Sequence, residues 1–434
     1  MIPAVQTCQP WNTGRKILFR FFFIYWILFI APWTWFSVIP GIDWLMQYYY
    51  QALDWLVGFM NGQLFHIREQ LVPINGSGDT SFGWAQVCTL LLIAACGTVA
   101  WTVIDRKKEY VRLHYWLCLI VRYNIALVCF LYGFIKVFHL QMPFPSYSQL
   151  ATPLGDLLPM RLSWMFMGYS HLYQGFSGAL EVLAGLLLLY RRTTTLGSLL
   201  AAGIFLNVAM MNLGYDIPVK IFSIHVFLMC AYLLVIEHRR LIDFFILNRA
   251  AAPSVLYQYT PSKRWMKAGK NVLKLAMIVL GLGFNLYNSY NWYQSDATNK
   301  TLPPLQAGLY DVTSFVLNGD TVPPLLNDTL RWQNIAIEQN NLGSVGAIDT
   351  SLWLRYNRSY FSYEPDTANH AIVFKKSQGT GDIACRFSYE QLDSSSFSLR
   401  GRRGKDSLFI VLKRSKRSFP LAERQFHWLS ERNR

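Results

Sequence analysis

Seven apolar segments in this chain are long enough to cross a lipid bilayer, and they constrain its fold more than any other feature. Crossing the hydrocarbon core takes about 20 apolar residues in a helix, because hydrocarbon offers the backbone no other hydrogen-bonding partner. With 53% hydrophobic and only 15% charged residues among 434, we expect an all-α polytopic membrane bundle. The segments are residues 17–36, 84–104, 113–137, 171–190, 194–213, 219–236 and 271–290.

The loops between these segments alternate in charge, and this alternation predicts the orientation of the chain. Short loops rich in Lys and Arg stay in the cytoplasm, while the intervening loops here are mainly acidic. We expect a bacterial inner (plasma) membrane protein with a cytoplasmic N-terminus and a periplasmic C-terminal domain. A net charge of +15 spread over such loops reflects topology and does not indicate nucleic-acid binding. The basic loop residues include Arg15, Lys16, Arg106, Lys107, Lys108, Arg112, Arg191, Arg192, Arg239, Arg240, Lys263 and Arg264.

The pattern divides the chain into four regions. Residues 1–112 hold two spans and, at 42–60, aromatic and aliphatic side chains at helical spacing beside acids and amides. That spacing favours an interfacial amphipathic helix over a short extra span. Residues 113–240 form a four-helix core, residues 241–293 hold a cytoplasmic loop and the last span, and residues 294–434 form a separate domain.

The C-terminal region is expected to be an antiparallel all-β soluble domain outside the membrane. Turn-forming Pro, Gly and Asn residues there separate short segments rich in Val, Ile, Phe, Tyr and Trp. Such spacing is typical of a small barrel or sandwich. The expected strands are residues 310–317, 330–338, 351–357, 371–376, 383–389, 396–400 and 407–412.

Basic residues gather near the end of this domain. Arg400, Arg402, Arg403 and Lys405 surround an expected hairpin turn at Gly401 and Gly404. A solvated basic face is the simpler interpretation, and binding to an anionic partner or to lipid head groups is the alternative.

Charged and amide side chains lie inside the apolar segments, and they mark the candidate functional site. An ionised side chain in hydrocarbon costs several kcal/mol, about 2.5 to 3.5 on insertion scales, so it normally faces the protein interior and finds a partner there. The candidate residues are Arg122, Lys136, Glu181, Asn207, Asn212, Asp216, Lys220 and His225, with Asn124 nearby.

Depth along the helices suggests which of these residues meet. At 1.5 Å per residue, Arg122 and Glu181 fall at similar depths in antiparallel neighbours, so an ion pair between them is geometrically available. Lys136 shares the outer level with Asn212, Asp216 and Lys220, while His225 lies deeper in its span. We therefore expect an inner ion pair and an outer polar layer around one shared chamber.

Three uses of such a chamber remain open from the residues alone: a pocket for a small ligand, a site for a quinone head group, or a proton path. The simpler interpretation is that the polar groups only order the helices. Haem would need a second imidazole at the depth of His225, and none is present. The seven cysteines include no C-x-x-C pair, so we expect neither a metal site nor a disulfide framework.

The motifs of the central region resemble those of the DoxX-like membrane proteins. Arg122 is followed by Gly133-Phe134-Ile135-Lys136 on the same segment, and Glu181-Val182-Leu183-Ala184-Gly185 opens the apolar stretch of the next. The likeness covers roughly residues 113–240, and the stretch from Asn212 to Lys220 looks like larger bacterial relatives. It implies a four-helix membrane core. Some members are subunits of thiosulfate:quinone oxidoreductases, and the residues carried over are Arg122, Gly133, Lys136, Glu181 and Gly185.

The leading hypothesis is a DoxX-like membrane protein whose buried polar site binds a quinone or another small ligand in a redox-linked process. The alternative is a non-enzymatic membrane scaffold whose outer β-domain recognises a protein partner. A third hypothesis, a polytopic carboxylase of the vitamin K type, requires a large outer catalytic region that the sequence does not show. Besides a small-molecule or quinone ligand and a protein partner, we expect membrane lipid to contact the chain.

Overall fold

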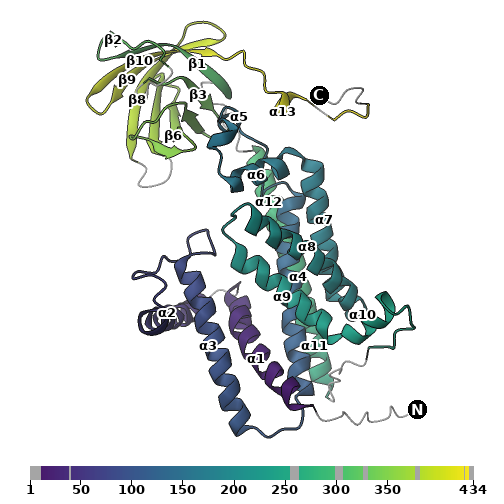
Figure 1. Ribbon diagram of the computed structural model, residues 1–434. Helices are drawn as coiled ribbons and strands as arrows, with labels where there is room; N and C mark the ends of the chain where they lie inside the picture. The colour runs from purple at the N-terminus through teal and green to yellow at the C-terminus, as the bar shows by residue number, and fades with distance from the viewer. Residues whose placement is uncertain are drawn as a thin grey trace. The chain divides into compact units, whose positions relative to one another are not determined.

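The structure is a computed structural model that describes residues 11–38, 41–254, 263–298, 306–325, 331–376, 382–424 and 426–429. The chain forms two compact units, and each combines separate stretches of sequence. The helical unit comprises Met1–Val137 and Gly175–Ser289, and the barrel unit comprises Phe138–Gln174 and Tyr290–Arg434. The chain passes between them at the end of α4 (Val111–Val137), within α7 (His171–Leu189) and within α12 (Asn285–Thr298) (Figure 1).

The described helices confirm a multi-pass membrane protein. Six are long and apolar enough to span a bilayer, and a seventh span is available if α9 and α10, bent by 78°, count as one. All seven expected segments lie on these helices. Their bounds are α1 Thr13–Ile30, α2 Asp43–Met60, α3 Ser81–Ile104, α4 Val111–Val137, α7 His171–Leu189, α8 Thr194–Gly214, α9 Lys220–Ile236, α10 His238–Phe245, α11 Arg264–Ile278 and α12 Asn285–Thr298, with short turns η1 Pro32–Val38, η2 Asn61–Phe65, η4 Arg191–Thr193 and η5 Val279–Phe284.

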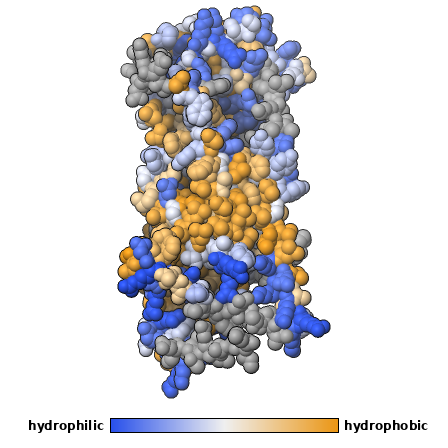
Figure 2. Space-filling model, turned by 90° about the vertical axis from the view of Figure 1, so that its right-hand side faces the viewer, coloured by the Kyte–Doolittle hydropathy of each residue, from blue (hydrophilic) through white to orange (hydrophobic). Residues whose placement is uncertain are grey.

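Local sequence explains where the spanning helices begin and which faces they expose. Asn12 and Thr80 cap α1 and α3, accepting hydrogen bonds from Arg15 N at 2.8 Å and Gly83 N at 3.2 Å. Ile104 of α3 is 81% exposed, which fits contact with lipid and would be costly in water. On the face that Figure 2 shows, the helical unit carries a broad band of apolar side chains.

Residues 42–60 form the helix that their spacing predicts. Figure 1 shows α2 end-on beside the lengthwise α3, so the two helices lie crosswise. Met46 and Val57 of α2 are buried, while Trp44, Tyr48 and Trp55 are exposed. An amphipathic helix with an exposed aromatic face suits the membrane interface, and that location stays a prediction.

The strand-rich region is an antiparallel β-barrel, as its turn spacing predicts. Eight strands follow the order β10-β9-β8-β7-β6-β4-β3-β1, and β1 pairs with β10 to close the ring. The remaining two, β2 and β5, pair with β1 and β6. The strands are β1 Gly308–Leu317, β2 Asp320–Thr321, β3 Asn334–Ile337, β4 Leu342–Val345, β5 Trp353–Arg355, β6 Arg358–Asp366, β7 Ala371–Lys376, β8 Ile383–Gln391, β9 Ser396–Arg403 and β10 Asp406–Arg414, followed by α13 Pro420–Glu423.

Aromatic side chains fill the barrel. Trp332 is fully buried and lies beside Phe315, Phe374 and Phe387, and the rings of Phe361 and Phe374 stack with centroids 4.0 Å apart. Alternation along each strand sends Phe315, Phe361, Phe374 and Phe387 inward and polar residues outward. The interior is therefore a packed core.

The sequence-based strand assignment was partly wrong. The seven expected strands correspond to β1, β3, β5, β7, β8, β9 and β10, but β2, β4 and β6 were missed. Leu330, the expected start of the second strand, lies outside the described residues. The hairpin turns at Gly404, where φ is +60°, whereas Gly401 lies inside β9 opposite Phe387 and Leu408. A Cβ at Gly401 would come within 1.9 Å of the Arg386 carbonyl oxygen, so this strand position requires glycine.

The segment between α4 and α7 packs against the barrel, although the sequence placed it inside the four-helix region 113–240. It contains α5 Tyr147–Leu150, η3 Leu154–Asp156 and α6 Pro159–Tyr169. The carboxylate of Glu338 on the barrel accepts hydrogen bonds from Ser148 N and Ser148 Oγ, both at 2.8 Å. Ala151 packs on Leu309 and Ala336. The barrel is thus completed by residues from the middle of the chain.

Candidate functional site

A buried ion pair joins two of the predicted site residues, Lys136 near the end of α4 and Glu181 in α7. Nζ of Lys136 donates to Oε1 of Glu181, and their side chains are 7% and 0% exposed. Oε2 of Glu181 is also buried, and it accepts no hydrogen bond from any residue that the structure describes. A carboxylate has about four acceptor positions. One oxygen of this buried acid is therefore left with unused hydrogen-bonding capacity.

Three glycines allow the helices to approach closely enough for this contact. A Cβ at Gly178 would lie 2.5 Å from the Gly133 carbonyl oxygen and 2.8 Å from Cβ of Lys136. A Cβ at Gly185 would lie 2.7 Å from the ring of Phe130. Gly178 and Gly185 flank Glu181 about one turn away on either side, on the same face of α7. The spacing of Gly133 and Lys136 on α4, and of Glu181 and Gly185 on α7, thus has a steric basis: the glycines allow the two helices to pack closely.

The expected ion pair between Arg122 and Glu181 is not formed. Lys136 occupies the carboxylate, and Arg122 lies fourteen residues earlier on α4, about 21 Å along the helix axis. Nη1 of Arg122 instead reaches Oγ1 of Thr194, at the start of α8, with a weak 3.4 Å contact. The depth argument failed because it aligned the ends of the two segments. In the structure, Gly178 rather than His171 lies beside the last turn of α4.

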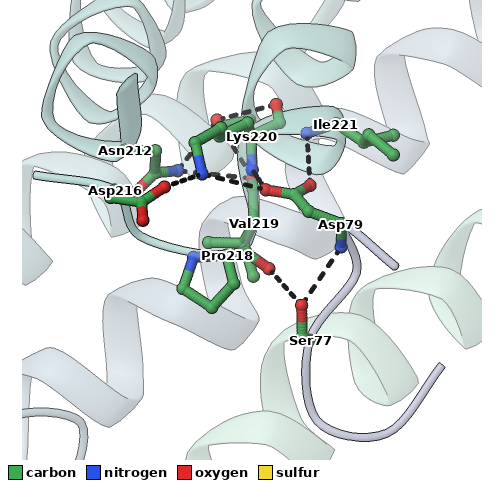
Figure 3. Close-up of polar contacts among 9 residues, drawn as sticks. Ser77, Asp79, Asn212, Asp216, Pro218, Val219, Lys220 and Ile221 are labelled. Atoms are coloured by element: carbon green, nitrogen blue, oxygen red, sulfur yellow. Dashed lines mark hydrogen bonds and ion pairs between the residues drawn. The ribbon is translucent and has the colours of Figure 1, made fainter. Parts of the chain in front are cut away.

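A second polar cluster surrounds the turn between α8 and α9 (Figure 3). Asp79, in the loop before α3, accepts hydrogen bonds from the backbone N–H groups of Lys220 at 2.7 Å and Ile221 at 2.9 Å. Ser77 donates to the Pro218 carbonyl oxygen at 3.1 Å. A carboxylate on the first N–H groups of a helix satisfies unpaired donors and complements the helix dipole. Asp79 therefore fixes the start of α9.

Lys220 joins this cluster with its side chain. Nζ lies 2.7 Å from Oδ1 of Asp216 and 3.7 Å from Oδ2 of Asp79. The Asp79 side chain is 8% exposed and that of Asp216 is 84% exposed, so the contact with Asp79 is the better shielded of the two. Asn212 links the same helices by donating to Oγ of Ser223 at 2.9 Å.

His225 is held on both of its ring nitrogens. Nδ1 lies 2.6 Å from the Ile221 carbonyl oxygen, which can only accept, so Nδ1 carries the proton. Nε2 then accepts from the Tyr25 hydroxyl of α1 at 2.6 Å. The ring stacks on Phe29 with a centroid distance of 4.0 Å. Because both nitrogens are occupied, this imidazole is not placed to ligate haem iron.

The predicted site residues form two clusters rather than one shared chamber. No hydrogen bond or ion pair between described residues joins Lys136 to Asn212, Asp216 or Lys220, with which it was expected to share a layer. Tyr132 of α4 contacts Phe222 of α9 between them, with ring centroids 5.6 Å apart. Asn207 is exposed on α8, and Asn124 donates to the Met229 sulfur at 3.4 Å.

Tyr25 and Asp79 were missed by the sequence argument. Tyr25 lies in a long aromatic run of α1, and Asp79 lies in a loop with Gly76 and Gly78. Neither has a local signal, because each acts on α9, far along the chain. Among the described residues, no group of three or more His, Cys, Asp or Glu side chains is placed to hold a metal ion.

Comparison with known proteins adds one relative without an assigned role. The uncharacterized protein YwoB of Bacillus subtilis (strain 168) is 38% identical over 84 residues, which is 19% of this chain and 54% of that protein. The chain thus spans about half the length of the curated relative that it matches. No protein-family model and no solved structure matches the chain.

Proposed function

We propose that this chain is a DoxX-like protein of the bacterial inner membrane, and that the Lys136–Glu181 pair binds the head group of a small lipid-soluble ligand, with a quinone as the candidate. The observation that carries the proposal is the buried Oε2 of Glu181, which has no hydrogen-bond donor in the described part of the chain although the side chain is 0% exposed. An unmet acceptor in a low-dielectric interior is costly. A bound hydroxyl would satisfy it.

Quinones suit this pair for a chemical reason. The hydroxyl of a reduced quinone can donate to Oε2 of Glu181, and the carbonyl of an oxidised quinone can accept from the ammonium group of Lys136. Both forms are soluble in lipid, so they can reach a residue buried among membrane helices. The proposal concerns binding of the head group at this pair.

The steric role of Gly133, Gly178 and Gly185 supports membership of the DoxX-like family. Four of the five residues carried over from that pattern meet at one α4–α7 contact, and only Arg122 lies elsewhere. The alternating charge of the loops supports the proposed orientation, with the basic loops in the cytoplasm and the barrel unit in the periplasm.

The test uses the full chain in lipid nanodiscs and measures binding of ubiquinone-1 and menadione by quenching of tryptophan fluorescence. Glu181→Gln should weaken binding by about 10- to 100-fold, because a hydrogen bond to a charged group contributes about 1.5 to 3 kcal/mol. Glu237→Gln is the matched control, since Glu237 is also a shielded carboxylate, paired with Arg240 at 2.7 Å. It should bind quinone like the wild type.

A double variant separates binding from folding. Removing one partner of a buried pair is strongly destabilising, about 3 to 5 kcal/mol, whereas replacing both by apolar residues is often neutral. Lys136→Met with Glu181→Leu should therefore restore thermal stability relative to the single variants and still bind no quinone. If the double variant binds both quinones as tightly as the wild type, the proposal is wrong.

A membrane scaffold is the second candidate, and a specific observation favours it. In the second cluster Asp79, Asn212, Lys220 and His225 all have partners within the protein. Polar groups that are already satisfied order helices without needing a ligand. Quinone binding that is undetectable in the wild type would favour this candidate.

A further inference from the structure

Three arginines occupy neighbouring positions on the outer face of the barrel. Arg386 of β8 and Arg402 of β9 are directly opposite each other in the antiparallel register. Arg400 lies two residues before Arg402, hence on the same face, and pairs with Ser388 of β8 and Phe409 of β10. All three side chains are exposed. We call Arg386, Arg400 and Arg402 the arginine face.

Within the described part of the chain, the positive charge of the arginine face has no acidic partner. Like charges directly opposite in a sheet are destabilising, and none of the three forms an ion pair with a described residue. The next residue shows the contrast. Arg403 points inward, where its Nη1 lies 2.7 Å from Oδ2 of buried Asp349. The inward arginine is thus neutralised, whereas the outward ones have no counter-ion among the residues that the structure describes.

One member of the face is held in place. The Arg400 guanidinium lies 5.1 Å from the centroid of the Phe409 ring, an arrangement that orients it without neutralising it. Guanidinium groups bind phosphate oxygens with two parallel hydrogen bonds. Exposed arginines that repel one another are therefore suited to a surface that presents several phosphates side by side.

Chain connectivity favours lipid head groups over other sources of phosphate. The barrel unit is joined to membrane-spanning helices at three points, at Val137, at Gln174 within α7 and at Ser289 within α12. These attachments keep the barrel near a bilayer, where lipid phosphate is at high effective concentration. We propose that the arginine face docks on the head groups of anionic phospholipids.

The test measures binding of lipid vesicles to the full chain held in phosphatidylcholine nanodiscs. The probe is a phosphatidylcholine vesicle with or without phosphatidylglycerol, followed by biolayer interferometry at several salt concentrations. The triple variant R386Q, R400Q and R402Q should weaken binding of the anionic vesicles on the order of 100-fold. The difference in affinity between the triple variant and the wild type should become smaller at higher salt, because salt weakens binding of anionic vesicles by the wild type.

A matched variant removes the same charge elsewhere. Lys413, Lys416 and Arg417 are exposed, and Arg417 also lies over an aromatic ring, 5.1 Å from that of Phe419. The triple variant K413Q, K416Q and R417Q should bind anionic vesicles within a few-fold of the wild type. Equal losses in the two triple variants would mean that net charge alone acts, and no loss in the first would mean that lipid binds elsewhere; either result overturns the proposal.

A single substitution distinguishes weaker lipid binding from misfolding of the barrel. R402Q removes the cross-strand repulsion, so it should raise the melting temperature of the barrel while weakening vesicle binding several-fold. A loss of both would show that Arg402 has a structural role and would count against the proposal. Loss of dextran sulfate binding by the triple variant, with vesicle binding unchanged, would assign the face to a soluble polyanion and overturn lipid docking.

Discussion

The Tyr25 hydroxyl of α1 donates to Nε2 of His225 of α9, and the two atoms lie 2.6 Å apart. The same imidazole is fixed by the Ile221 carbonyl and by stacking on Phe29. This contact joins the first helix of the chain to the last helix of the predicted four-helix core. Nδ1 of the imidazole carries the proton, because it faces the Ile221 carbonyl oxygen, which can only accept. Nε2 is therefore the acceptor for the Tyr25 hydroxyl.

Tyr25→Phe should destabilise the protein by about 1 to 3 kcal/mol, because it leaves a buried imidazole nitrogen without its donor. The measurement is a thermal shift of the full chain in detergent. Tyr190→Phe is the matched control, since Tyr190 is 50% exposed, and it should melt like the wild type. Equal melting temperatures for Tyr25→Phe and the wild type would mean that the hydrogen bond contributes nothing.

Asp79→Ala should loosen the start of α9 at a cost of about 1 to 2 kcal/mol, because two backbone N–H groups lose their acceptor. The stability of Asp79→Asn should lie between those of Asp79→Ala and the wild type, since an amide keeps one acceptor oxygen but loses the charge. Limited proteolysis at the loop before α3, combined with thermal shift, measures the effect. Asp216→Asn, which alters the exposed partner of Lys220, should be cut like the wild type.

Gly178→Ala should force α4 and α7 apart, because its Cβ would lie within 2.8 Å of Lys136 Cβ and closer still to the Gly133 carbonyl oxygen. Overpacking of this kind costs about 1 to 3 kcal/mol. We expect a lower melting temperature and weaker binding of any ligand that uses the Lys136–Glu181 pair. Gly203→Ala in α8 is the control, because outside its own stretch of helix no described atom lies within 4 Å of the new Cβ; it should be tolerated.

The stability of the barrel should fall in acid because of Asp349. Burial alone would raise the pKa of this carboxyl, but hydrogen bonds from Ser351 and Arg403 hold the pKa below its usual value. A carboxyl with a lowered pKa in the folded state adds stability above its unfolded pKa, about 3.9, and that stability is lost as the pH falls through the folded value. The wild-type barrel should therefore weaken below about pH 4.

Asp349→Asn isolates this contribution. At neutral pH it should cost about 3 kcal/mol, because Arg403 loses its close, buried partner and keeps only Asp406, which is 3.8 Å away and 43% exposed. The difference from the wild type should narrow as the pH falls below about 4, because the carboxyl is protonated first in the unfolded state and then, at its lowered pKa, in the folded state. Thermal melts of the barrel followed by near-ultraviolet circular dichroism from pH 7 to pH 3 measure it. A difference that stays constant across this range would contradict the assigned role.

Hydropathy made the membrane helices predictable, whereas short strands were not. Each expected span lies on an observed helix, because a run of about 20 apolar residues has few other folded states. Strand β4 has only four residues and includes Gly343, and β6 contains Pro365 and two acids. Both are held by their neighbours in the barrel. Strand formation there depends on pairing more than on local preference.

The members of the polar site could be predicted from the sequence, but most of their partners could not. Lys136 and Glu181 stand out because charge is rare in apolar segments. Their pairing depends on how far α7 extends past the end of α4, and hydropathy does not report that offset. The contact of Asp79 with α9 depends on a loop whose path has no periodic pattern. The sequence therefore predicted which side chains belong to the polar site, but it did not predict the relative positions of the helices that carry them.

The composite make-up of the barrel unit has a consequence for how the protein is made. Phe138–Gln174 leaves the ribosome long before the first strand, yet its contacts with Glu338, Leu309 and Ala336 need strands β1 and β3. During synthesis this segment cannot form these contacts until β1 and β3 have been made, and contacts so distant along the chain form slowly. Expressing residues 294–434 alone would yield a barrel that lacks the piece covering Ala336, whose apolar surface would then be open to aggregation.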